Sequence, residues 1–129
     1  VHVVKKYNLL SKEHNGDYLT PEQIYQRAKV GLDSINIAPE FGVTQTRLLV
    51  DEGHVPLSKA FDTCVSKGKF KKWIPKDHVV KPDDKLVVEV SGHYSYMQNP
   101  FKGNTSNVNK NLRKILFKRF DVIHEAFNV

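Results

Sequence analysis

Apolar residues recur at steps of three and four near the C-terminal end of this sequence. They occupy the positions Val108, Leu112, Ile115, Leu116, Phe120, Ile123 and Phe127. Such spacing places side chains along one face of a helix. Most basic residues of the same segment fall on the opposite face, at Lys110, Arg113, Lys114 and Lys118. The pattern predicts an amphipathic helix.

The N-terminal part of the chain combines short apolar runs with helix-start signals. An apolar run over 7–13 is followed by Thr20, which can cap a helix, and by Pro21, which suits the first helical position. Gln23 completes a capping box. A β-branched run over 33–38 predicts a strand, and a second helix is expected over 43–51. Strand, helix, strand, helix is the pattern of a parallel α/β sheet.

The rest of the chain requires no strand before residue 86. A helix is expected over 56–67, followed by a Lys-rich turn around Trp73 and a polar linker over 75–84. The run 86–97 has local strand propensity, but we assign it to a helix because the C-terminal part is otherwise helical. We therefore expect a βαβα segment over 1–53 and a helical extension over 54–129.

Composition narrows the class of protein. The chain has 129 residues, 40% hydrophobic and 26% charged, which is typical of a soluble globular domain. No apolar run approaches the roughly 20 residues of a membrane span. The single cysteine, Cys64, cannot form an internal disulfide, and this favours a reducing, cytoplasmic setting.

The net charge of +6 is concentrated at one end of the chain. Residues 101–129 carry six basic and two acidic groups, so four of the six net charges lie there. This distribution allows binding to nucleic acid or to an acidic membrane. A solvated helix face is the favoured interpretation, because no nucleic-acid-binding motif accompanies the charge.

Polar residues follow both predicted strands. In parallel α/β folds, ligands bind beyond the carboxyl ends of the strands. The candidates after the first strand are His14, Asn15 and Asp17, and those after the second are Asn36 and Glu40. The helix start near 43–44 offers free amides for an anion. A hydrogen-bonded structural histidine and an ordinary Asn-Gly-Asp turn are the alternative interpretation.

The segment 12–20 resembles a motif of the accessory, non-catalytic subunits of class II tagatose-bisphosphate aldolases. The matching residues are Glu13, His14, Asp17, Tyr18 and Thr20. A looser match covers 34–48, where that family has its last barrel strand and helix. The resemblance implies the C-terminal portion of a (β/α)₈ TIM-type barrel, with two βα units followed by the helical extension. The start at Val1 rather than Met agrees with a partial chain.

The resemblance also implies a site and its chemistry. In class II aldolases a zinc ion polarises the carbonyl of a sugar phosphate. His14 would be a zinc ligand that Asp17 orients, and Asn36 would receive a phosphate or hydroxyl together with the amides near 43–44. The implied substrate-binding residues are Asn15, Asp17, Asn36 and Glu40. The remaining zinc ligands and the catalytic acid would lie on earlier strands, so lyase activity requires a complete barrel.

Two kinds of function remain open. The first is part of a sugar-phosphate aldolase or of its accessory subunit, with a sugar phosphate, a catalytic aldolase subunit and an oligomeric state as expected partners. The second is a small basic binding module, which would use the last helix and the cluster 69–73 to bind nucleic acid or an acidic protein. Only the second predicts binding that falls steeply with added salt.

Overall fold

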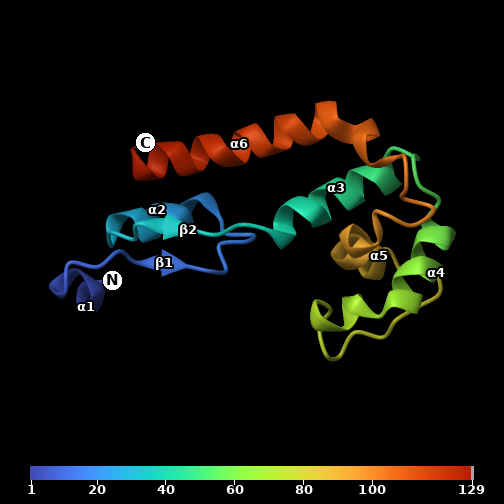
Figure 1. Cartoon of the computed structure of the whole chain (residues 1–129), viewed down its shortest axis with the longest axis horizontal. Helices are drawn as coiled ribbons and strands as arrows, with labels where there is room; N and C mark the ends of the chain where they lie inside the picture. The colour runs from blue at the N-terminus through green and yellow to red at the C-terminus, as the bar shows by residue number, and fades with distance from the viewer. Residues whose placement is uncertain (129) are drawn as a thin grey trace. The chain divides into compact units, whose positions relative to one another are not determined.

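The computed structural model describes residues 1–128 (Figure 1). Helices account for 59% of the chain and strands for 3%. The chain divides into two compact units, which are described separately. Unit 1 contains Val1–Glu40 and the residues from Lys114 onward, and unit 2 is Phe41–Arg113. The division falls inside two helices, whereas the hydrophobic pattern placed a boundary after Gly53.

Unit 1 is built around a pair of short parallel strands. Its elements are α1 (His2–Lys6), β1 (Lys12–Glu13), α2 (Pro21–Lys29), β2 (Ser34–Ile35), the start of α3 (Pro39–Asp51) and most of α6 (Asn109–Phe127). In the sheet, Lys12 pairs with Ser34 and Glu13 with Ile35. The helix α6 runs beside α2 (Figure 1), where the Tyr25 hydroxyl donates to Glu125 Oε2 at 2.9 Å.

The start of α2 follows the sequence signals. Thr20 Oγ1 accepts a hydrogen bond from Gln23 N at 3.2 Å, and Gln23 Oε1 accepts one from Thr20 N at 2.9 Å. These two bonds satisfy amides that the first helical turn leaves without a partner. Pro21 occupies the first turn, where it gives up no helical hydrogen bond. The predicted capping box is confirmed.

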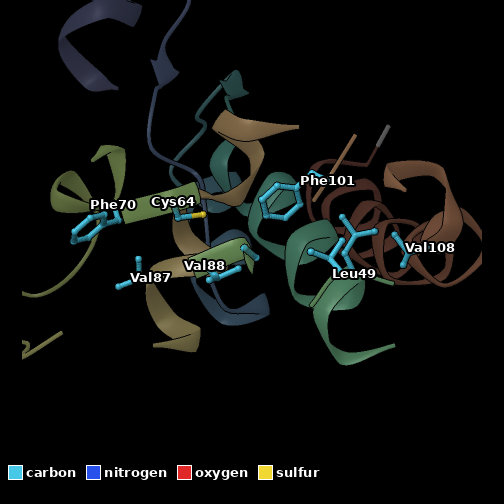
Figure 2. Close-up of a cluster of buried hydrophobic side chains, with 9 residues drawn as sticks. Leu49, Cys64, Phe70, Val87, Val88, Phe101 and Val108 are labelled. Carbon is cyan, nitrogen blue, oxygen red and sulfur yellow. The ribbon is translucent and has the colours of Figure 1, made fainter. Parts of the chain in front are cut away.

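Unit 2 is entirely helical. It contains the rest of α3, followed by α4 (Leu57–Lys67), the 3₁₀ turn η1 (Lys69–Lys72), α5 (Lys85–Ser91), and the 3₁₀ turns η2 (Gly92–Ser95) and η3 (Thr105–Val108). Figure 2 shows the side chains that form its core. The labelled members are Leu49, Cys64, Phe70, Val87, Val88, Phe101 and Val108, each at most 7% exposed. The predicted helix over 56–67 is confirmed. The helix predicted over 86–97 is confirmed as far as Ser91, where α5 ends and the 3₁₀ turn η2 follows.

A small polar cluster lies inside unit 2. Thr46 Oγ1 donates to the carbonyl oxygen of Gly42 at 2.8 Å and lies 2.8 Å from the Tyr96 hydroxyl. Thr46 itself is fully buried. Burial raises the pKa of Tyr96 to about 12. The hydroxyl therefore stays neutral well above the pH at which an ordinary tyrosine ionises.

The barrel assignment is wrong. The sheet has two strands of two residues each, and residues 1–128 contain no further strand. The second predicted βα unit fails because α3 packs Leu48, Leu49 and Val50 in the helical core of unit 2. Strands over 7–13 and 33–38 shorten to β1 and β2, because the ladder between them extends over only two residue pairs.

We predict that Thr20→Ala destabilises unit 1 by about 1 kcal/mol, because the Gln23 amide at the start of α2 loses its acceptor, the Thr20 hydroxyl. Thr20→Ser keeps the hydroxyl, so the loss of stability should be only a few tenths of the loss in Thr20→Ala. Chemical denaturation followed by circular dichroism measures both variants. Equal midpoints for wild type and Thr20→Ala would show that the cap contributes nothing.

We predict that unit 2 loses stability between pH 10 and about 12. The pKa of Tyr96 is raised in the folded state, so its contribution is complete below pH 10 and is lost as the pH approaches 12. Ionisation of this one hydroxyl can lower the free energy of unfolding by at most about 1.4 kcal/mol per pH unit. Urea unfolding at about pH 9 and about pH 11 measures it.

The comparison that isolates this effect uses two phenylalanine variants. Tyr96→Phe should lose less stability at alkaline pH than the wild type. Tyr7→Phe changes an exposed residue and should lose as much stability as the wild type. An identical alkaline loss in wild type and Tyr96→Phe would contradict the assignment.

Candidate functional site at the carboxyl ends of the strands

His14 and Asn36 are neighbours at the carboxyl ends of the two strands. His14 follows β1 directly and Asn36 follows β2, and the strands are parallel and in register. Because α2 connects the two strands, their carboxyl ends lie next to each other. His14 and Asn36 therefore lie at the ends of neighbouring strands, as the sequence predicts. The spacing also predicts that the His14 ring faces the same cavity as Asn36, and this stays a prediction.

A β-bulge lies at the carboxyl ends of the two strands. Asn36 N donates to the carbonyl oxygen of Glu13, and the carbonyl oxygen of Asn36 accepts from Gly16 N, both at 2.9 Å. Two residues, His14 and Asn15, therefore lie opposite the single residue Asn36. Bulges of this kind redirect side chains and are frequent beside functional sites. Only glycine fits at position 16, since a Cβ there would lie 2.0 Å from Ile35 Cγ2.

Three polar side chains at the bulge are available to a ligand. His14, Asn15 and Asn36 are exposed, and their side chains form no hydrogen bond within residues 1–128. Together they present an imidazole and two amides, which can donate and accept hydrogen bonds. This arrangement can bind sugar hydroxyls or the polar groups of a protein surface.

Asp17 serves the fold. Its Oδ1 accepts hydrogen bonds from Ala38 N at 3.0 Å and from Glu40 N at 2.8 Å, across the start of α3. A carboxylate is favourable there because a helix N-terminus carries unpaired amides and partial positive charge. The predicted orientation of His14 by Asp17 is not observed, since no hydrogen bond joins their side chains within residues 1–128.

The expected anion site near 43–44 is also displaced. The helix α3 begins at Pro39, four residues earlier than predicted, so the amides near 43–44 belong to the helix interior and not to its first residues. The true helix start is already occupied by the Asp17 carboxylate. The Asp17 carboxylate thus occupies the helix start, the kind of position at which a phosphate would bind.

Glu40 is held by a nearly buried ion pair. Its Oε2 lies 3.0 Å from Arg119 Nη2 and accepts a hydrogen bond from Tyr18 N at 2.8 Å. The side chains of Arg119 and Glu40 are only 13% and 17% exposed. Arg119 also donates to the carbonyl oxygen of Leu19. Glu40, predicted to bind substrate, instead connects the loop after β1 to α6.

Arg119 was not among the residues that the sequence pattern pointed to. Its position does carry a signal, because Arg119 follows Leu116 by three positions and precedes Ile123 by four. A charged residue on the apolar face of a helix requires a partner. The pattern did not point to Arg27 either, whose Nε and Nη2 donate to the two carboxylate oxygens of Glu13 at 2.7 and 3.0 Å. These bonds raise the pKa of Arg27.

The residues around His14 do not fit a zinc site by themselves. A protein zinc ion takes at least three ligands from His, Cys, Asp or Glu. Here the Asp17 and Glu40 carboxylates are already bonded to amides and to Arg119. Within residues 1–128 no group of three such side chains could hold a metal. His14 as a metal ligand stays a prediction that needs ligands from outside residues 1–128.

Comparison with protein-family models, with curated proteins and with solved structures gives no match.

In the part of the chain that is described, none of the helices combines the length and the apolar character that crossing a membrane requires.

We predict that Asp17→Ala destabilises unit 1 by about 1 to 2 kcal/mol, because two amides at the start of α3 lose their acceptor. The neighbouring change Asn15→Ala removes an exposed side chain without a partner and should stay within about 0.5 kcal/mol. Urea denaturation at neutral pH compares the two variants. Equal stability of both would contradict the structural role of Asp17.

Proposed function

We propose that this chain is a non-catalytic part of a sugar-phosphate aldolase system, in which it binds and supports a catalytic subunit. It does not itself perform the carbon–carbon cleavage. The proposal rests on the resemblance of the segment 12–20 to the accessory subunits of class II tagatose-bisphosphate aldolases. It makes no use of a barrel within these residues.

One observation carries the non-catalytic role. The two carboxylates among the candidate residues, Asp17 and Glu40, are already engaged by backbone amides and by Arg119. A general base or a metal ligand must have a free lone pair directed at its target. Carboxylates engaged in this way hold loops and helices in place. The matching motif therefore acts as a scaffold that presents His14, Asn15 and Asn36.

The sheet supports a role in binding a partner. Within residues 1–128 neither strand has a second neighbour, so each carries one edge without a ladder. Such edges tend to pair with another chain. Beside β2 the surface forms a groove lined by apolar side chains, namely Ile35, Ile37, Ile123 and Phe127. A partner that covers the edge and the groove would also contact the exposed polar residues at the bulge.

The proposed setting is the reducing cytoplasm. Cys64 is a free thiol with 1% exposure in the core of unit 2. Burial raises the pKa of this thiol, which keeps it protonated and unreactive.

The test mixes the chain with the catalytic subunit of a class II tagatose-bisphosphate aldolase. We expect a complex in sedimentation velocity and a longer half-life of the catalytic subunit's activity. The double variant His14→Ala/Asn36→Ala should weaken the complex about tenfold, or about 1.4 kcal/mol, with an unchanged unfolding midpoint. The control is Ser66→Ala/Gln98→Ala, which alters two exposed positions in unit 2.

Two results would reject the proposal. One is the absence of both a complex and any change in half-life. The other is cleavage of tagatose bisphosphate by this chain alone when zinc is supplied.

A further inference from the structure

Unit 2 carries a run of lysines without counterions. Between Asp62 and Asp77 the sequence has five lysines and no acidic residue: Lys67, Lys69, Lys71, Lys72 and Lys76. All five side chains are exposed. None of them forms an ion pair within residues 1–128. This stretch is therefore a local excess of positive charge.

The concentration of charge sets this stretch apart. Five cations elsewhere in the chain have a carboxylate partner within 3.7 Å, in the pairs Lys5–Asp33, Arg27–Glu13, Arg47–Glu89, Lys85–Asp51 and Arg119–Glu40. The five lysines of the run instead lie close together in the sequence, with no acidic residue among them. A concentrated patch of unpaired charge attracts a partner of opposite sign. The unpaired run therefore indicates an external partner.

The run has a fixed backbone. The helix α4 ends at Gly68, which adopts the left-handed conformation with φ of 72°. Phe70 then inserts into the core with 7% exposure. The carbonyl oxygen of Phe70 accepts hydrogen bonds from Trp73 N at 2.9 Å and from Ile74 N at 3.2 Å. With Phe70 as the anchor, the lysines at 69, 71 and 72 remain at the surface.

Trp73 is exposed in the middle of this charge. The helical spacing of Phe70, Trp73 and Ile74 predicts a packing role for the tryptophan, but its side chain is 44% exposed. The indole Nε1 donates to the Tyr94 hydroxyl at 3.0 Å, which fixes the orientation of the ring. A preoriented aromatic side chain loses little entropy when a partner covers it.

We propose that the lysine–tryptophan surface, formed by Lys67, Lys69, Lys71, Lys72 and Trp73, binds an acidic polypeptide segment. An apolar side chain of that segment packs on the Trp73 ring, and the flanking carboxylates pair with the lysines. An exposed tryptophan inside a charged rim is the usual anatomy of a protein interface. Single-stranded nucleic acid sites rely on successive aromatic platforms, whereas this surface has one.

This inference does not depend on the proposed function, because the surface shares no residue with the bulge. The experiment uses a synthetic peptide of glutamates around one leucine, labelled with fluorescein. We expect binding by fluorescence anisotropy that weakens as salt is added. Trp73 is the single tryptophan of the chain, so its emission should shift to shorter wavelength when leucine covers the ring.

Two variants of equal charge change localise the effect. The triple variant Lys69→Glu/Lys71→Glu/Lys72→Glu should weaken peptide binding at least about tenfold. The matched control, Lys110→Glu/Lys114→Glu/Lys118→Glu on the exposed face of α6, should change it less than about twofold. If the first variant fails to fold, the same lysines changed to glutamine should still weaken binding severalfold.

Three outcomes would overturn the inference. Equal losses in both triple variants would mean that net charge, and not this surface, attracts the peptide. An unchanged Trp73 emission on saturation would remove the ring from the interface. Tighter binding of an oligothymidylate than of the peptide at the same salt would assign the surface to nucleic acid.

Discussion

The hydrogen bonds of the Asp17 carboxylate to the start of α3 determine the organisation of unit 1. They connect the loop after β1 to the chain after β2, at the edge where the two strands end. The amide of Glu40 donates one of these hydrogen bonds to Asp17. The side chain of Glu40 extends the connection to α6 through its ion pair with Arg119. Three segments distant in sequence thus depend on two carboxylates. The same contacts give both carboxylates a structural role.

Structural contacts account for several residues of the motif in the segment 12–20. Glu13 is bonded to Arg27, Asp17 to two amides, and Thr20 to the first turn of α2. Each of these residues belongs to the matching motif, and each satisfies backbone or side-chain groups that the fold would otherwise leave unpaired. The side chains of His14, Asn15 and Asn36 are exposed and form no hydrogen bond within residues 1–128. The motif fixes the position of these three side chains.

Sequence reasoning succeeded where the deciding interactions are local. The capping box at Thr20 spans three residues, and the apolar spacing of α6 repeats within its own helix, so both were predictable. The roles of Asp17 and Glu40 were not, because their partners lie 21 to 79 residues away. The lengths of the two strands were overestimated for a similar reason. Apolar runs indicate strand propensity, but the length of a strand depends on the ladder that its neighbour supplies.

Hydrogen exchange at the amides of Ala38 and Glu40, followed by NMR, tests the central claim most directly. The structural role of Asp17 predicts that both amides are protected in the wild-type chain and exchange rapidly in Asp17→Ala, with added inorganic phosphate changing neither result in the wild type. Rapid exchange in the wild-type chain, or protection that appears only with phosphate, would contradict it. The helix start would then be open to a ligand.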